Sequence, residues 1–472
     1  MKNKKERVIK SIFSLLLSQI FIKAIGLAYK LYLTNKEGFG DLGNAIYSSG
    51  FQIYALLLTF SSTGVPNAIS KLIAERVAVG DNKGANKIFK IAFITFGFFG
   101  LVGSVLLFLG AKKISNSWMQ IPEAENSLIA LSPSIFFVSI TSVIRGYFNG
   151  RQNFTVTAKS QSIEQVFKTF FTIILVEIII LIGRKNVKIM AAVANLATTI
   201  ATLCSFIYIY IYYQFRKKEI QFEIEQTVNY TPTRIRKTIK QILKVAMPIS
   251  VSSLISSFNK NIDSCTIVRL LKRNLGEENA KIQYGILSGK IDSLCAIAFS
   301  VNIAFVTVLV PSIAKNMAKK DIDMASTKAR RFLLASFLIA VPITILFFFF
   351  PEQILKLLFP NTTSGATYLK ISSLAIIFMI MAQTTNAILQ SIGKVNIPPI
   401  SFGIGMVVKL LCNIILIPNE SFGIFGAIIG NVMCNAIAFV ISFSILYKNL
   451  NLKTKIYKKI SLKRGILSNI GE

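Results

Sequence analysis

The chain has 472 residues, 53% of them hydrophobic, and a mean hydropathy of +0.59, which is too apolar for an ordinary soluble domain. Its formal net charge is +32. It contains no histidine, and this excludes Ser-His-Asp catalysis, histidine-ligated metal and histidine proton relays. The five cysteines lie in apolar stretches and form no C-x-x-C pair, so we expect neither a disulfide framework nor a metal site.

Apolar windows of about 20 residues recur along nearly the whole chain, and a helix of that length spans a bilayer. The first window follows MKNKKER but continues through Lys23 to Leu33 without a small-residue cleavage site, so we interpret it as a span rather than a signal peptide. The sequence predicts an all-α polytopic membrane protein with about twelve transmembrane helices, at 11–33, 44–66, 88–110, 127–148, 162–183, 189–213, 241–270, 282–314, 329–350, 366–392, 396–418 and 422–447.

Basic residues are distributed unequally between the two sets of alternating loops. The segments 1–10, 67–90, 149–160, 214–244, 315–331, 393–395 and 448–472 hold 34 Lys and Arg, whereas the loops on the other side hold 10. Because cytoplasmic loops carry the excess of Lys and Arg, we expect a multi-pass protein of the cell membrane with both termini cytoplasmic. The charge then reports topology and contact with anionic membrane lipids, and no nucleic-acid partner is expected.

The long polar connection after the sixth span divides the chain. We predict a six-helix lobe at 1–213, a cytoplasmic linker at 214–240, a second six-helix lobe at 241–447 and a basic cytoplasmic tail at 448–472. Two short motifs recur across the linker at nearly the same offset: Val65-Pro66 as Val310-Pro311, and Gly150-Arg151 as Gly393-Lys394. Because six spans separate each pair, the lobes are predicted to be parallel repeats, a plan suited to alternating access.

The Gly-basic-x-Asn turn at Gly150 and Gly393 also has a simpler interpretation. Glycine allows a tight turn between helices, asparagine caps the following helix, and the basic residue anchors at the headgroups. This interpretation needs no substrate contact by Arg151 or Lys394.

Ionisable residues inside the predicted spans are costly in a bilayer and are usually functional. The anions are Glu164, Glu177, Asp263 and Asp292; the cations are Lys23, Lys30, Arg145, Lys168, Lys260, Arg269, Lys290, Lys370 and Lys409. Lys370, Arg269 and Lys409 are able to extend to the headgroups. Helical spacing would also let Glu164 pair with Lys168, and Lys260 with Asp263. The remaining interior is predicted to be net basic.

Four of these cations are candidate ligands for an anion such as a diphosphate. Lys23 and Lys30 lie two turns apart on one face of the first helix, Arg145 ends the fourth span, and Lys260 lies inside the seventh. The alternative is that Lys23 and Lys30 pair with acids of other helices.

Three of the acids are candidate cation-binding or gating charges: Glu164, Asp263 and Asp292. The sequence leaves open whether Na⁺ or H⁺ is coupled or the membrane potential acts alone, and it indicates no cofactor.

Three segments carry a family resemblance: GVPNAISKLIAE at 64–75, SVIRGYFNGRQN at 142–153 and KSQSIEQVFK at 159–168. With them the chain resembles the stage V sporulation protein B-like branch of the multidrug/oligosaccharidyl-lipid/polysaccharide exporter superfamily. That superfamily also contains lipid II flippases and multidrug-and-toxin extruders.

The resemblance implies two six-helix lobes in a V that opens alternately to each side, and undecaprenyl-diphosphate-linked sugars as substrate. It also implies that first-helix basic residues contact the diphosphate; here these are Lys23 and Lys30, lysines in place of the usual arginines. Flippases of the group commonly carry fourteen spans, whereas the chain after Lys448 is too polar to supply two more. The expected partners are a lipid-linked glycan and membrane lipids, and we expect a monomer.

Two other functions are consistent with a polytopic membrane protein. A multidrug-type cation antiporter predicts an acidic or aromatic interior, in contrast to the basic one expected here. A polyprenyl-dependent membrane glycosyltransferase needs a carboxylate base near the membrane surface, for which Glu37 or Asp41 is available.

Overall fold

The computed structural model describes residues 18, 21–59, 64–183, 186–227, 230, 232, 234–318 and 321–450. Within these ranges every regular element is a helix. The tail after residue 450, and residues 11–17 and 19–20 of the predicted first span, therefore lie outside the described residues.

The helices follow the predicted spans, with short helices added between them. Residues 21–35 are helical and precede α2. The further elements are α2 (Gly40–Thr59), α3 (Val65–Ala78), α4 (Asn82–Lys113), η2 (Ile114–Met119), η3 (Pro122–Ala124), α5 (Glu125–Gly150), α6 (Phe154–Leu181), α7 (Val187–Phe215), α8 (Lys217–Glu225), α9 (Ile235–Leu275), α10 (Glu277–Gly285), η4 (Ile286–Ile291), α11 (Asp292–Ala318), α12 (Ile322–Phe349), α13 (Pro351–Leu358), α14 (Ala366–Ser391), α15 (Ile397–Leu416) and α16 (Phe425–Asn449).

Eight helical stretches of the described chain are long and apolar enough to cross a membrane. They include α4, α5, α7, α12, α14, α15 and α16, and the stretch Glu277–Asn302. The predicted spans at 162–183 and 241–270 correspond to α6 and α9, which carry more charged residues, such as Glu164, Lys168 and Glu177 in α6. The chain is a multi-pass membrane protein, and its count of twelve spans stays a prediction.

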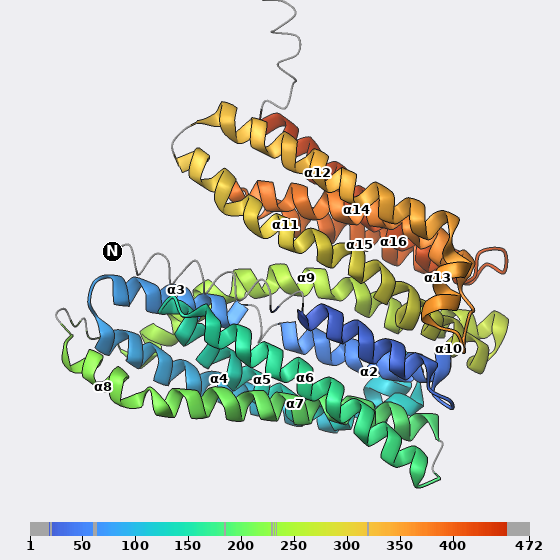
Figure 1. Ribbon diagram of the computed structural model, residues 1–472, viewed down its shortest axis with the longest axis horizontal. Coiled ribbons are helices and arrows are strands. Elements are labelled where there is room, and N and C mark those ends of the chain that lie inside the picture. The colour runs from blue at the N-terminus through green and yellow to red at the C-terminus, as the bar shows by residue number, and fades with distance from the viewer. Residues whose placement is uncertain are drawn as a thin grey trace, which may run out of the picture.

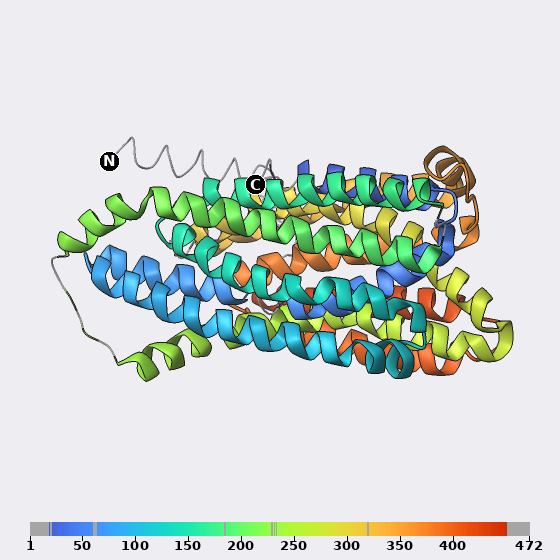
Figure 2. The same ribbon diagram turned by 90° about the horizontal axis from the view of Figure 1, so that it is seen from below.

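The long helices run side by side along the longest axis of the molecule and form two lobes (Figures 1 and 2). The first lobe contains residues 21–35 with α2–α8, the second contains α10–α16, and α9 lies between them. In Figure 1 the lobes meet where α10 and α13 lie, and we name this the latch end. At the far end α11 and α12 stand away from the first lobe.

The outer faces of both lobes are apolar. Ile94 and Leu109 of α4 are 73% and 72% exposed, and Phe349 of α12 and Ile415 of α15 are 67% and 66% exposed. Such continuous apolar surface is unfavourable in water and is satisfied by lipid chains.

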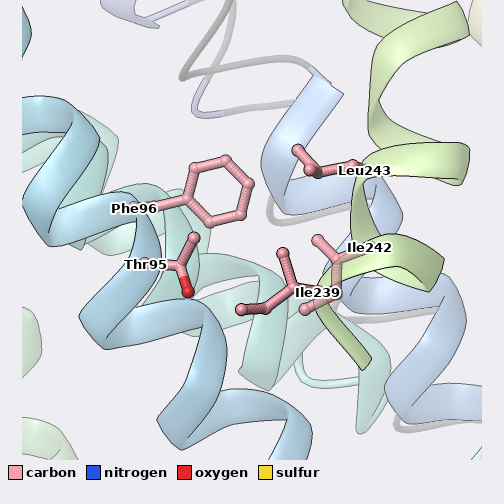
Figure 3. Close-up of a pocket in the computed structure, with 5 residues that line it drawn as sticks. All are labelled: Thr95, Phe96, Ile239, Ile242 and Leu243. Carbon is pink, nitrogen blue, oxygen red and sulfur yellow. The ribbon is translucent and has the colours of Figure 1, made fainter. Parts of the chain in front are cut away.

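Helix α9 packs on both lobes. Its first part contacts α4, where Ile239, Ile242 and Leu243 meet Thr95 and Phe96 and leave a crevice too small for a water molecule (Figure 3). Its last part packs on α15 in the second lobe. The helix also begins at Ile235, inside the range predicted as linker. The short α8, which ends earlier, is joined to the first lobe by the ion pair between Arg151 and Glu223.

The turn at Gly150 corrects one sequence interpretation. Asn153 and Asn396 stand at the N-cap positions of α6 and α15, but neither side chain makes a capping hydrogen bond. Arg151 does not extend to solvent, since its guanidinium lies 4.8 Å from the centre of the Tyr147 ring and pairs with Glu223.

Two glycines of the RGYFNG motif let α3 and α5 cross closely. A Cβ on Gly146 would lie 2.9 Å from the Pro66 carbonyl oxygen, and one on Gly150 would lie 2.8 Å from the Ser70 carbonyl oxygen. Contacts with rigid backbone at these distances leave no room for a side chain. The motif is therefore explained by helix packing in the first lobe.

Replacing Gly146 by valine is expected to lower the stability of the first lobe by about 1–3 kcal/mol through overpacking. The thermal unfolding midpoint of the purified protein measures this. Gly403→Ala is the matched control, because a Cβ at Gly403 meets nothing within 4 Å. A midpoint of Gly146→Val equal to that of the control would contradict the close-crossing explanation.

Candidate functional site

The buried lysine of the first helix is held by residues of α2. Lys30 is 6% exposed, and its Nζ donates to the Ser48 hydroxyl at 3.4 Å and lies 4.9 Å from the centre of the Tyr47 ring. Lys23, two turns earlier, is exposed. The first helix thus presents one buried and one exposed lysine.

Lysines from two other helices join these residues. Lys30 interacts electrostatically with Lys168 of α6 and with Lys260 of α9, and Lys23 interacts with Lys260. We name Lys23, Lys30, Lys168 and Lys260 the basic cluster. Three elements, separated widely in sequence, therefore place like charges together, as an anion site requires.

Lys168 was missed as a candidate because its spacing suggested a pair with Glu164. In the structure it is 8% exposed, and its Nζ lies 4.2 Å from the centre of the Phe51 ring and 5.1 Å from that of Tyr29. Aromatic faces stabilise a cation without neutralising it. The described contacts of the Lys168 ammonium are thus with aromatic rings rather than with an acid.

Asp292 is the first residue of α11. Among the described residues, it is the acid that interacts electrostatically with Lys30. It is partly exposed and forms no ion pair with the described part of the chain. The cluster therefore keeps a net positive charge, with a single carboxylate of the second lobe beside it.

Arg145 and Glu164, both predicted as site residues, pair with each other in this structure. The Arg145 guanidinium, buried inside the first lobe, donates to Glu164 Oε2 at 2.8 Å, to Ser160 Oγ at 2.9 Å and to Ser205 Oγ at 3.0 Å. The two charges thus join α5, α6 and α7 as a satisfied buried pair. Arg145 is not available to an anion in this conformation, and Glu164 is committed to Arg145 rather than to Lys168.

Asp263 pairs with a residue of another helix instead of Lys260. Its Oδ2 accepts from Lys409 Nζ of α15 at 2.6 Å. Lys409 is 1% exposed, so the expectation that it extends to the headgroups is wrong. Lys260 is consequently left exposed and without an acid partner in the described chain, which keeps it in the basic cluster.

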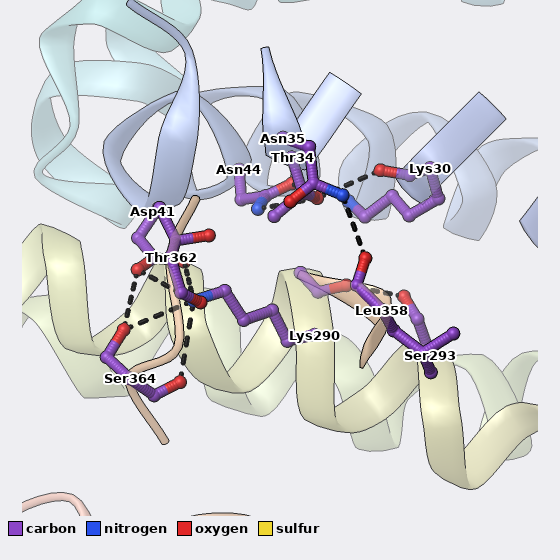
Figure 4. A network of polar contacts seen from close by, with 11 residues as sticks. Lys30, Thr34, Asn35, Asp41, Asn44, Lys290, Ser293, Leu358, Thr362 and Ser364 are labelled. Atoms are coloured by element: carbon purple, nitrogen blue, oxygen red, sulfur yellow. Dashed lines mark hydrogen bonds and ion pairs between the residues drawn. The ribbon is translucent and has the colours of Figure 1, made fainter. Parts of the chain in front are cut away.

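At the latch end, a buried ion pair joins the lobes (Figure 4). Lys290 of η4 lies 2.9 Å from Asp41 Oδ1 of α2, and the two side chains are 0% and 9% exposed. Ser364 Oγ donates to Asp41 at 2.9 Å, and Lys290 also donates to the carbonyl oxygen of Thr362. We name Asp41, Lys290, Thr362 and Ser364 the latch.

Further polar contacts support the latch. Asn35 Nδ2 donates to the Leu358 carbonyl oxygen at 2.8 Å, and Asn361 Nδ2 donates to the Asn35 carbonyl oxygen at 2.6 Å. Lys281 Nζ of α10 lies 2.8 Å from Glu123 Oε1. Asp41, which was a candidate general base for a membrane enzyme, is thus occupied as the counter-ion of Lys290.

The described residues contain no group of His, Cys, Asp and Glu able to hold a metal ion. The five cysteines are free thiols. The candidate site therefore consists of the basic cluster on the first helix, α6 and α9, and of the latch at one end of the molecule.

The overall fold matches solved transporters over nearly the full chain. An inward-facing multidrug resistance MATE family transporter of the MOP superfamily aligns with a TM-score of 0.73 at 17% identity, covering 91% of this chain and 96% of the other. An outward-facing structure aligns with a TM-score of 0.64 at 18% identity, covering 95% and 98%. A MOP superfamily transporter from Pyrococcus furiosus, described by a binding pocket of reverse polarity, aligns with a TM-score of 0.65 at 17% identity, covering 95% and 97%. The two-lobed helical fold is that of the MOP transporters.

The chain belongs to the polysaccharide biosynthesis protein family, whose model matches residues 8–317, and the MatE model matches residues 248–415. Stage V sporulation protein B of Bacillus subtilis is 23% identical, covering 91% of this chain and 81% of its own length. The lipid II flippase MurJ of the same organism is also 23% identical, covering 98% and 87%. The resemblance seen in the sequence is confirmed, and the protein is a membrane transporter rather than an enzyme.

Proposed function

We propose that the protein is a flippase that moves lipid-linked glycan precursors, carried on a polyprenyl diphosphate, from the inner to the outer leaflet by alternating access. In this proposal the diphosphate docks on the basic cluster, the sugars pass between the lobes and the lipid tail stays in the bilayer. The product would serve the synthesis of cell wall, spore cortex or surface polysaccharide.

The observation that carries the proposal is the charge of the basic cluster. Four lysines from three elements are accompanied by one nearby acid, Asp292, whereas Glu164, Asp263 and Asp41 are each paired with another cation. Such a site attracts a polyanion and repels an organic cation, which favours a diphosphate over the substrates of a multidrug antiporter. The name of the MurJ relative, a lipid II flippase, is consistent with this substrate class.

The topology in this proposal has both termini in the cytoplasm, because the basic loops then lie on the inner side. The latch end faces outward, and the lobes diverge toward the cytoplasm, in agreement with the higher TM-score to the inward-facing transporter. A monomer in contact with anionic lipids suffices for this arrangement. An inside-negative potential favours outward movement of the diphosphate by about 2.3 kcal/mol per charge per 100 mV.

The test is translocation of a fluorescent undecaprenyl-diphosphate sugar in proteoliposomes that contain the purified protein. We expect flipping above that of empty vesicles, and faster flipping when an inside-negative potential is imposed. The same vesicles are assayed for uptake of a fluorescent organic cation. Cation uptake without lipid flipping would refute the proposal and favour an antiporter.

A further inference from the structure

Lys409 carries a buried ammonium group at the contact between α15 of the second lobe and α9. It projects from α15, is 1% exposed, and donates from Nζ to Asp263 Oδ2 at 2.6 Å and to the Asn259 carbonyl oxygen at 3.0 Å. Both partners lie on α9, one turn apart. The lysine therefore occupies an oxygen-lined position between two helices, apart from the basic cluster and the latch.

Asn413 is a second buried polar side chain beside Asp263. Asn413, one turn after Lys409, is 0% exposed, and its Nδ2 donates to Asp263 Oδ1 at 3.3 Å and to Thr266 Oγ1 at 2.8 Å. The Oδ1 atoms of Asn413 and Asn259 are buried and have no hydrogen-bond partner in the described structure.

The set of donors fits a monovalent cation. The Asp263 carboxylate and the Asn259 main-chain carbonyl, which contact the ammonium, are hard oxygen ligands of the kind that alkali and alkaline-earth ions accept. A single carboxylate balances a single positive charge. The Lys409 ammonium carries the same charge and occupies the same position.

We propose that Lys409 fills a monovalent-cation site with its own ammonium group, so that the wild-type protein binds no Na⁺ or other coupling ion at Asp263. Removing the ammonium exposes this latent site to a free cation such as Na⁺. The assignment concerns the contact between α9 and α15 and does not depend on which substrate the transporter carries. Under the proposed function it leaves the membrane potential, rather than an ion bound at Asp263, as the driving force.

The experiment measures thermal unfolding of the purified full chain in detergent, in NaCl or in choline chloride of equal ionic strength. We expect the wild-type midpoint to be the same in both salts. Lys409→Ala should have a lower midpoint in choline chloride, because an unpaired carboxylate is left buried. Added Na⁺ should raise that midpoint saturably, by about 2 °C or more at concentrations well above the dissociation constant.

Matched variants separate this site from general salt effects. Lys409→Ala combined with Asp263→Asn should lose the Na⁺ response, and Lys370→Ala, which removes an exposed lysine, should behave as wild type. If Lys409→Ala does not fold, Lys409→Gln supplies the same test with less loss of volume.

Saturable Na⁺ stabilisation of the wild type that disappears in Asp263→Asn would overturn the assignment. A folded Lys409→Ala or Lys409→Gln protein without a Na⁺ response would overturn it as well. No readout uses a lipid substrate, so failure here is distinct from failure of the flippase proposal.

Discussion

Replacing Lys30 and Lys168 together by alanine is expected to lower the affinity for a diphosphate-linked lipid by about a hundredfold or more. Each lysine can give the anion a charge-assisted hydrogen bond worth about 1.5–3 kcal/mol, and the two contributions combine in the double variant. Both side chains are buried, so solvent screens them less than the exposed Lys23 and Lys260. Flipping in proteoliposomes at low substrate concentration measures the loss.

Stability separates a binding role of these lysines from a structural one. The two like charges are desolvated and interact unfavourably with each other, and Lys30 has no acid within hydrogen-bond distance in the described chain. Their removal should therefore leave the unfolding midpoint unchanged or raise it. Lys370→Ala is the control for loss of an exposed lysine. A stably folded double variant that flips lipid at the wild-type rate would refute docking of the diphosphate on the basic cluster.

Replacing Lys290 by alanine is expected to shift the protein away from the conformation closed at the latch end. The change leaves Asp41 buried without its counter-ion, at a cost of about 3–5 kcal/mol to that conformation. Because opening this end returns Asp41 to water, the open state avoids the cost. A shift of this size is enough to reverse the population of a two-state equilibrium.

Distances between spin labels on the two lobes measure the shift. Labels at Lys113 of the first lobe and Lys356 of the second, both at the latch end, should move apart in Lys290→Ala. The double variant Asp41→Asn with Lys290→Met removes both charges and should restore the closed distance, because a neutral pair of similar volume replaces a buried ion pair at little cost. Unchanged label distances in a folded Lys290→Ala protein would show that the ion pair does not hold the lobes together.

The membrane class and the family were predictable from the sequence because both depend on local information. Hydropathy over windows of about 20 residues reports burial in lipid, whatever the tertiary packing. The motifs GVPNAISKLIAE and SVIRGYFNGRQN carry the family, and the close approach of α3 and α5 at Gly146 and Gly150 supplies a packing reason for two of their glycines. Lys23 and Lys30 were predictable as candidates because charge inside a span is costly wherever its partner lies.

The partners of the embedded charges were not predictable, and two pairings inferred from helical spacing were wrong. Glu164 pairs with Arg145 rather than Lys168, and Asp263 pairs with Lys409 rather than Lys260. A neighbouring pair on one helix contributes only about 0.2–0.5 kcal/mol, whereas a buried charge left unpaired costs several kcal/mol.

The sequence by itself thus determined that this protein spans the membrane, belongs to a transporter family and carries more positive than negative charge inside its spans. Only the tertiary structure decided which of those charges are neutralised. Lys290 pairs with Asp41 and Lys409 pairs with Asp263 across helices that are far apart in the chain, while Lys30 and Lys168 interact as like charges. Helix packing fixes these distances, and in a medium of low dielectric constant distance determines which charges pair and which stay available to a substrate.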